Sequence, residues 1–180
     1  MTGSLPSVLQ TLLADSHYFS LQRSVCHHNH HRQHDIASIE SMDSWAQFRL
    51  MKQLLCVRHP RQSLPSSLLL EIDQVLLEER ANRLLLDAAS IPALPTPSSS
   101  KPLPATLHLW QGDITTLDGV TAITNAANEQ MLGCFQPAHR CLDNVIHARA
   151  GPRLREECFH HMDQGQRTLP VGQACATKGY

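Results

Sequence analysis

The chain has 180 residues, of which 42% are hydrophobic and only 4% aromatic, and its net charge is -1 when histidine is neutral. This length suits one ordinary domain with an extension, and the apolar fraction is sufficient for an aliphatic core. The near-neutral charge gives no sign of a nucleic-acid or membrane partner, and no run reaches the roughly 20 apolar residues of a membrane-spanning helix.

Six cysteines are present, at positions 26, 56, 134, 141, 158 and 175. Disulfides are one alternative, but the chain is not small and lacks the basic region and apolar stretch of a secretory signal. We therefore expect reduced thiols in a cytoplasmic protein. In that compartment, neighbouring cysteine and histidine residues indicate a metal site more than a bridge.

The first quarter of the chain combines a short apolar pattern with a histidine-rich tract. Leu9, Leu12 and Leu13 fit a short helix. The tract His27–His34 is of a composition that can bind metal, although its spacing is loose. A solvated loop is the favoured interpretation, because no apolar framework surrounds it.

Two helices are predicted next. The first begins at Ser44, which is expected to cap it, and ends before Pro60, since proline has no backbone donor. The second is expected to run from Pro65 to about Asp87. Its apolar face comprises Leu68, Leu69, Ile72, Val75, Leu76 and Leu84. Both helices are interpreted as packing elements, because such faces must be covered.

Composition divides the chain into three parts. Residues 91–106 contain five prolines and three serines, which is typical of a linker. Seven of the eight glycines lie from Gly112 onward. We therefore predict a helical N-terminal extension over 1–90, a linker over 91–106 and a turn-rich α/β unit over 107–180.

In the α/β unit, strands are predicted at 107–110 and 120–124, and the segment 172–180 is expected to begin another. The second strand runs directly into a polar loop that starts at Asn125. Ligands bind beyond the carboxyl ends of strands in open α/β sheets, which favours a site here. Asp143 is expected to cap the next helix, and Pro152 to open one whose Leu154 and Cys158 face inward.

Cys134, His139 and Cys141 follow a C-x4-H-x-C spacing. Zinc takes thiolate and imidazole ligands, and three protein ligands with one open position are typical of a catalytic site. The spacing is not that of a standard zinc finger. From the spacing alone, two buried cysteines beside a surface histidine are therefore the favoured interpretation over a zinc site.

Several strings in this half resemble a known family. These are Gly112–Thr115, Thr124–Asn128 and Ile146–Gly151, and together they look like the opening half of a macrodomain. That family binds ADP-ribose, and many members hydrolyse it from proteins. The segment Gly133–Cys141 replaces the usual glycine run and resembles the zinc-dependent branch, as does Leu54–Pro60 in the extension.

The resemblance implies a three-layer α/β/α fold, of which this chain holds the N-terminal part only, preceded by an α-helical extension. Further strands and a second glycine-rich loop for the diphosphate would follow in such a fold. A C-terminal truncation is therefore expected, with an exposed sheet edge and weak ligand binding.

The resemblance also implies roles for individual residues. Cys134, His139 and Cys141 would hold Zn²⁺. Asn128 would hydrogen-bond the distal ribose, and Asp143 would stabilise the reacting sugar or position water, which makes both catalytic candidates. Asp113 would accept from the adenine amino group, with Ile114 beside the base. Each has a structural alternative: Asp143 as helix cap, Asp113 in a turn and Asn128 in a loop.

Two further polar residues are interpreted as structural. Asn125 is expected to tie the loop to neighbouring backbone, and His147 to pack or to support the site from behind.

The leading functional hypothesis is a zinc-dependent hydrolase that removes mono-ADP-ribose from modified protein side chains. Its expected partners are ADP-ribose and an ADP-ribosylated protein, with no nucleic acid and no membrane. The alternatives are a reader that binds ADP-ribose without cleaving it, an inactive truncated fragment, and an interaction or metal-storage protein with structural zinc.

Overall fold

The structure is a computed structural model that describes residues 5–15, 36–95 and 105–180. The histidine-rich tract 27–34 and most of the predicted linker lie outside these ranges, so the predictions for them stay as they are. Among the described helices, none combines the length and the apolar character needed to cross a membrane.

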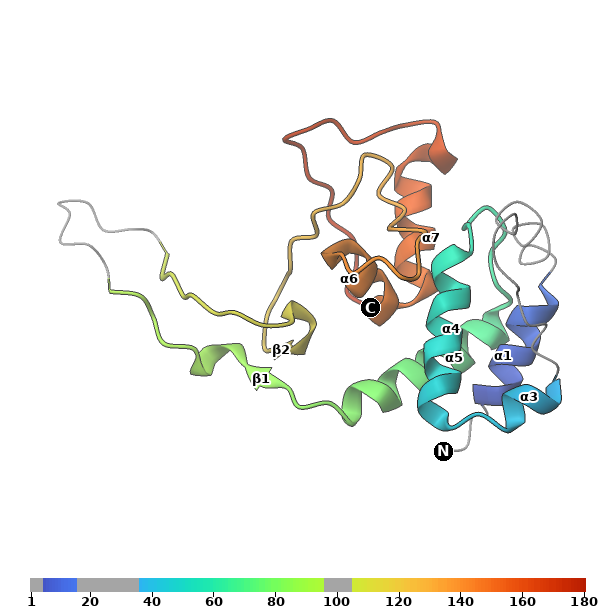
Figure 1. Ribbon diagram of the computed structural model, residues 1–180. Coiled ribbons are helices and arrows are strands. Elements are labelled where there is room, and N and C mark those ends of the chain that lie inside the picture. Colours follow the sequence, from blue (N-terminus) through green and yellow to red (C-terminus); the bar gives the residue numbers. More distant parts are fainter. Residues whose placement is uncertain (1–4, 16–35, 96–104) are drawn as a thin grey trace.

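Four helices form the N-terminal part: α1 (Leu5–Ala14), α3 (Ile36–Glu40), α4 (Ser44–Val57) and α5 (Ser66–Ala81). α1 packs against the other three, as the cluster of helices in Figure 1 shows. The core between them is aliphatic, as its composition predicts, and its most buried members are Val8, Leu9, Ile39, Met51 and Ile72.

α4 begins at Ser44, as predicted, but its cap is the preceding residue. The Asp43 side chain accepts a hydrogen bond from the backbone N–H of Ala46 at 2.7 Å, so Asp43 is the cap and Ser44 is the first helical residue. The prediction of Ser44 as the cap was wrong because two adjacent residues are both good caps, and the aspartate reaches the free N–H.

α5 is shorter than predicted. It ends at Ala81, where the side chain and backbone of Asn82 donate to carbonyls of the last turn, including that of Glu78 at 2.8 Å. The carbonyls of the last turn have no hydrogen-bond partner inside the helix. Asn82 provides that partner, and the helix ends before it. Leu84 therefore lies beyond the helix and is 96% exposed, which contradicts its place on the apolar face.

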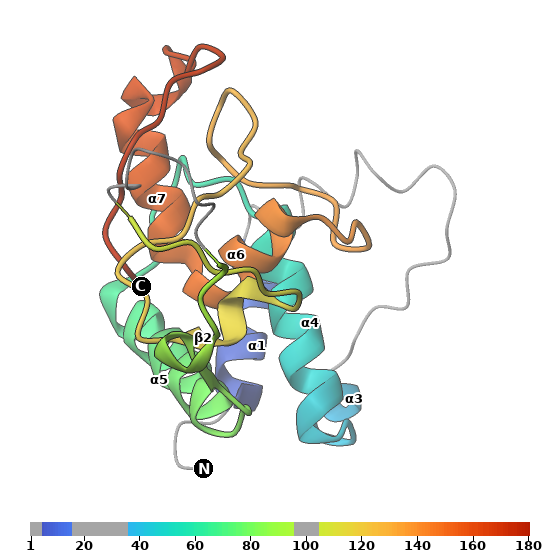
Figure 2. The ribbon, with the colours of Figure 1, turned by 90° about the vertical axis from the view of Figure 1, so that its left-hand side faces the viewer.

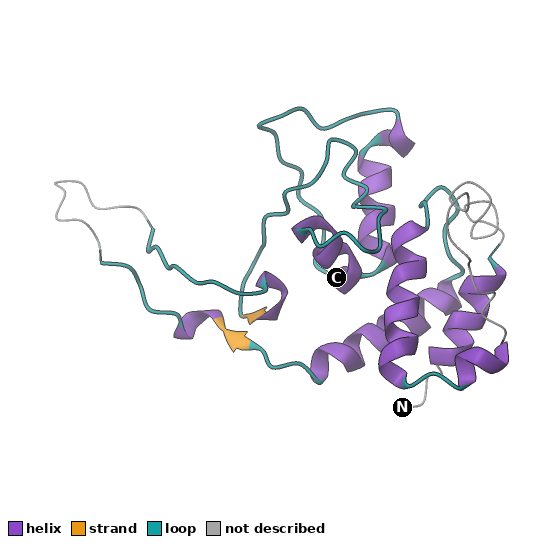
Figure 3. Cartoon of the chain, viewed as in Figure 1, coloured by secondary structure: helices purple, strands orange, loops and turns teal. Residues whose placement is uncertain are grey.

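The second half holds much less β-structure than predicted (Figure 3). β1 (Leu86–Asp87) pairs in parallel with β2 (Leu117–Asp118), and Ala93 forms an isolated bridge with His108. In the described residues, the segments 107–110, 120–124 and 172–180 form no strand. A strand needs a neighbour along its whole length to satisfy its backbone, and the described residues provide one only at the bridge between Ala93 and His108. The α/β character is thus limited, and the three-layer arrangement stays a prediction.

A second core lies around α6 (Leu142–Ala150) and α7 (Pro152–His161), beside the helical cluster in both views (Figures 1 and 2). Pro152 opens α7, and Leu154 and Cys158 are buried, as predicted. The other buried members of this cluster are Met131, Leu132, Ile146, Phe159 and Met162.

Gly151 joins α6 to α7 with φ +79°, and a Cβ there would meet Leu76 of α5 at 2.7 Å. Glycine is therefore required at the point where the two cores meet.

Candidate metal centre

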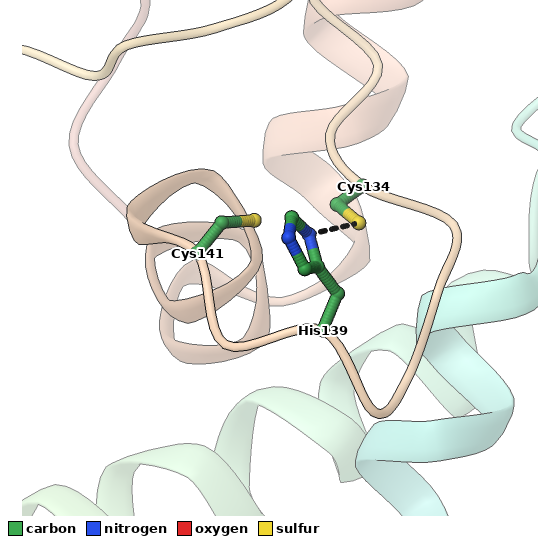
Figure 4. A group of neighbouring side chains, drawn as sticks. All are labelled: Cys134, His139 and Cys141. Carbon is green, nitrogen blue, oxygen red and sulfur yellow. Dashed lines mark hydrogen bonds between the residues drawn. The ribbon is translucent and has the colours of Figure 1, made fainter.

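Cys134, His139 and Cys141 converge in the loop before α6. One potential ligand atom from each lies within 4.8 Å of the other two. Figure 4 shows both sulfurs pointing toward the imidazole ring of His139. We call residues 133–141 the metal loop. The sequence brought these three residues to notice by spacing, and the structure places them together.

The geometry of the loop fits a zinc ion. Cys134 Sγ and His139 Nδ1 are 3.4 Å apart. Ligand atoms at about 2.3 Å (sulfur) and about 2.05 Å (nitrogen) from a tetrahedral zinc would be about 3.5 Å from each other. Both cysteines are only partly buried and His139 is exposed. The donor set of two thiols and one imidazole is thus one that can hold zinc.

The N-terminus of α6 is capped by a metal-loop residue. The backbone N–H of Asn144 donates to Cys141 Sγ at 3.4 Å, which makes Cys141 the cap. The prediction of Asp143 as the cap was therefore wrong, because a thiol two residues earlier occupies that position.

Asp143 instead points into the protein and is 7% exposed. Its Oδ1 accepts from Asn125 Nδ2 at 2.7 Å and lies 3.5 Å from His147 Nε2. Asn125 thus binds a side chain rather than backbone, contrary to expectation. His147 supports Asp143 from one turn further along α6, as the support role predicted. Two side chains fix one carboxylate oxygen directly behind the metal loop.

His147 is neutral in this environment. Burial first and the charge of Arg155 second lower its pKa to about 4, although the nearby Asp143 carboxylate acts in the opposite direction. Its ring also explains a glycine in the metal loop. Gly133 has φ +78°, and a Cβ at that position would come within 2.7 Å of the imidazole. Only glycine lets the loop pass so close to His147.

Asn128 organises the start of the same loop. Its Nδ2 donates to the carbonyl of Gly133 at 3.1 Å, and its Oδ1 accepts from the backbone N–H of Gln130 at 3.1 Å. The loop-forming alternative therefore describes its contacts. The expected contact with ribose stays a prediction, and the side chain is exposed beside the metal loop.

Asp113 and Ile114 lie in a different element. Asp113 caps the short helix η2 (Ile114–Thr116) by accepting from the N–H and hydroxyl of Thr115 at 2.9 and 2.7 Å. Burial raises the pKa of Asp113, but these hydrogen bonds outweigh it and the net pKa is lowered. η2 packs against α6. Within the described residues, no hydrogen bond or ion pair joins Asp113 to the metal loop.

Three residues that support the metal loop were missed from sequence: Cys56, Asn144 and Arg155. Burial raises the pKa of the Cys56 thiol, so it is a hydrogen-bond donor. Arg155 is 6% exposed, between buried Leu154 and Cys158 on α7. The position of Arg155 on the apolar face of a predicted helix could have indicated from the sequence that this charged residue has a specific buried role. The five cysteines of the described ranges are free thiols, which agrees with the expectation for these residues.

Comparison with known proteins gives consistent results. Residues 124–180 match the family model described as Macro domain. A protein named "Probable bifunctional ADP-ribose hydrolase/ADP-ribosyltransferase" from Fusarium oxysporum f. sp. cubense is 46% identical over 155 residues, which cover 84% of this chain and 25% of that protein.

Two bacterial proteins with the name "Protein-ADP-ribose hydrolase" are similar to the second half of the chain. One, from Staphylococcus aureus strain Mu50, is 49% identical over 74 residues, or 41% of this chain and 27% of that protein. The other, from Treponema medium, is 48% identical over 73 residues, or 41% and 28%. The chain thus spans about a quarter of the length of the curated relatives it matches.

Proposed function

We propose that this chain carries the metal-binding part of a macrodomain protein-ADP-ribose hydrolase. The match of residues 124–180 to the Macro domain and the names of the relatives support this class of function. The observation that carries the proposal is the convergence of Cys134, His139 and Cys141 directly after the loop of Asn128. In this proposal the metal would lie where the resemblance puts the distal ribose.

The cofactor in this proposal is Zn²⁺, held by the two thiolates and the imidazole of the metal loop. When bound, zinc supplies Lewis-acid chemistry that polarises an oxygen of the sugar or of water. The soft sulfur donors and the 3.4 Å spacing between Cys134 Sγ and His139 Nδ1 support zinc over a hard cation such as Mg²⁺.

Asp143 is the proposed catalytic carboxylate. Its Oδ1 accepts a hydrogen bond from Asn125 and lies 3.5 Å from His147 Nε2. Within the described residues, its Oδ2 has no hydrogen-bond partner. That oxygen is left to stabilise positive charge at the anomeric carbon or to orient water. Asn128, whose amide can both donate and accept, is the proposed ribose contact, and Asp113 with Ile114 the proposed adenine contact. The substrate is a mono-ADP-ribosylated protein side chain in the cytoplasm.

The test is release of ADP-ribose from a mono-ADP-ribosylated protein. We expect turnover to require metal and to be lost in Cys141→Ala, whereas Cys175→Ala, a partly buried thiol outside the metal loop, retains it. Full activity in chelated samples would contradict the zinc mechanism. Calorimetry that shows ADP-ribose binding, with no product from any substrate, would identify a reader instead of a hydrolase.

A further inference from the structure

The C-terminal end of α4 docks onto α7 through one buried arginine. Arg155 Nη1 donates to the carbonyls of Leu55 and Cys56, both at 2.8 Å, and of Arg58 at 3.0 Å. The last carbonyls of a helix have no intrahelical partner, and they carry partial negative charge. The two N–H groups of this one nitrogen are shared among the three carbonyls, and the positive charge of the guanidinium is buried beside them. Arg155 therefore fixes the end of α4 against the second core.

The same guanidinium reaches the metal loop. Its carbon Cζ lies 4.7 Å from the centre of the Phe135 ring, a cation–π distance. Phe135 directly follows the ligand Cys134, and its ring also stacks on His59 with 5.9 Å between ring centres. His59 comes two residues after the end of α4. The residue next to the first ligand is thus held by both helical parts of the molecule.

Cys56, in the last turn of α4, makes the most direct contact. Its thiol donates to the carbonyl of Cys134 at 3.1 Å and lies 3.3 Å from Asn144 Oδ1. Asn144 Nδ2 in turn donates to the carbonyls of Gln136 at 3.1 Å and His139 at 2.9 Å. Cys56 and Asn144 therefore contact the backbone at both ends of the metal loop.

We propose that Cys56 and Arg155 are positioning residues for the metal loop, so that docking of α4 sets the affinity of the loop for its metal. This inference rests on the proposed function only in that the loop binds zinc. Cys56 acts by orienting the backbone of Cys134, not as a ligand, since the three-ligand cluster does not include it. Groups that orient metal ligands from outside typically contribute 10- to 100-fold to metal affinity.

The first experiment measures the Zn²⁺ dissociation constant of the 180-residue chain by competition with a chelator. We expect Cys56→Ala to weaken binding about tenfold or more, and Cys56→Ser, which keeps a donor, to restore most of it. The control is Cys158→Ala, which removes another buried thiol. Within the described residues Cys158 has no hydrogen bond to the metal loop, so binding should be unchanged even if the variant is less stable.

The second arm tests docking through Arg155. Arg155→Lys replaces the planar guanidinium over the Phe135 ring with a compact ammonium on a shorter side chain, and should weaken zinc binding. The matched control is Arg153→Lys on the same helix, whose side chain pairs with Asp73 of α5 at 2.8 Å and, among the described residues, has no hydrogen bond to the metal loop. If zinc affinity falls in Arg155→Lys but not in Arg153→Lys, Arg155 acts on the metal loop specifically. The effect is then not a general result of weaker packing between the helices. Equal effects of the two variants would contradict the role of Arg155.

The Co²⁺-substituted protein separates a positioning residue from a ligand. We expect wild type and saturated Cys56→Ala to show the same thiolate-to-cobalt absorption intensity, with a shift of the ligand-field bands in the variant. A drop in that intensity would make Cys56 a ligand and overturn the proposal. If wild type binds metal but Cys56→Ala binds as tightly as Cys158→Ala, this inference fails alone. Absence of metal binding by wild type would instead defeat the zinc mechanism proposed above.

Discussion

Asp143 is the residue whose role the structure changes most. Its carboxylate is turned inward and held by Asn125 and His147 through one oxygen. A residue that only capped α6 would face the backbone N–H groups, which Cys141 serves instead. Burial of this polar group is compensated by these two side chains, which fix the position of the carboxylate proposed above as catalytic.

Asp143→Asn should lower the rate of ADP-ribose release by about 100-fold or more, because a neutral amide cannot serve as a base or stabilise positive charge. ADP-ribose affinity should change much less, since the amide oxygen can still accept from Asn125. Steady-state kinetics with calorimetry check both. Asp118→Asn, at an exposed ion pair with Arg80, is the control and should change neither. An active Asp143→Asn would remove the residue from the mechanism.

His147 should make the stability of the protein depend on pH. Its folded-state pKa is about 4, below the ordinary value of 6.5, so the unfolded chain binds more protons as pH falls. Stability is then fully present above about pH 6.5 and is lost as pH falls toward 4. Between pH 7 and pH 5 this group accounts for about 2 kcal/mol.

Urea unfolding of wild type and His147→Gln at both pH values measures this loss. Glutamine does not titrate, so the variant should lose about 2 kcal/mol less than wild type between pH 7 and pH 5. Equal losses in the two proteins would mean that His147 is not held neutral in the fold.

At the scale of single residues, local spacing identified the three candidate ligands but not the residues that contact their loop from other parts of the chain. Cys134, His139 and Cys141 lie close together in the chain, so a pattern can show them. Cys56 contacts Cys134 across 78 residues, and Arg155 contacts Leu55 across 100. No local pattern encodes such contacts. The choice of cap among neighbouring polar residues likewise depends on geometry that the sequence leaves open, as Asp43 and Cys141 show.

The helices were predictable as elements because their periodicity is local. α4, α5 and α7 occur close to where the apolar spacing and the prolines place them, and α5 ends early because Asn82 satisfies its last carbonyls. The strands predicted at 107–110 and 120–124 do not form. A strand is stable only beside a partner strand, which local periodicity cannot reveal. The side chains of Leu107, Leu109 and Val120 are exposed, so the apolar pattern that predicted these strands is not buried in a core.

The start of α4 offers a test of the helix boundary. Asp43→Ala should lower the free energy of unfolding by about 1 kcal/mol, because the N–H of Ala46 loses its acceptor. Ser44→Ala is the neighbouring control and should change it little, since alanine is a good residue inside a helix. Urea denaturation distinguishes the two. A larger loss for Ser44→Ala would restore Ser44 as the cap.

At the scale of the molecule, the two cores meet through a few specific contacts. Gly151 lies against Leu76, Arg153 pairs with Asp73, and Arg149 pairs with Glu79. Glu79 also pairs with Arg83 at 3.1 Å, which makes a small network between α5 and α6. A ligand that stabilises the second core should therefore stabilise the whole described structure.

Zinc should raise the melting temperature in one transition. At a free concentration 100 times the dissociation constant, the gain is about 2.7 kcal/mol, or roughly 5–10 °C for a chain of this size. His139→Ala should abolish most of it, and His160→Ala, an exposed histidine of α7, should not. Circular dichroism at two wavelengths checks this. An undiminished shift in His139→Ala would point to zinc bound elsewhere, such as the histidine-rich tract.

Cys56 contacts Cys134, and Arg155 contacts Leu55, so both contacts join the first third of the chain to its second half. These contacts also set an order of assembly. The entropy of closing a loop grows only with the logarithm of its length, so contacts across 78 and 100 residues are accessible once both partners exist. During synthesis, the α1–α5 cluster leaves the ribosome first and can fold early. The metal loop follows and closes fully only after Arg155 has emerged. The helical part is then the template on which the loop folds, already in place when the ligands arrive.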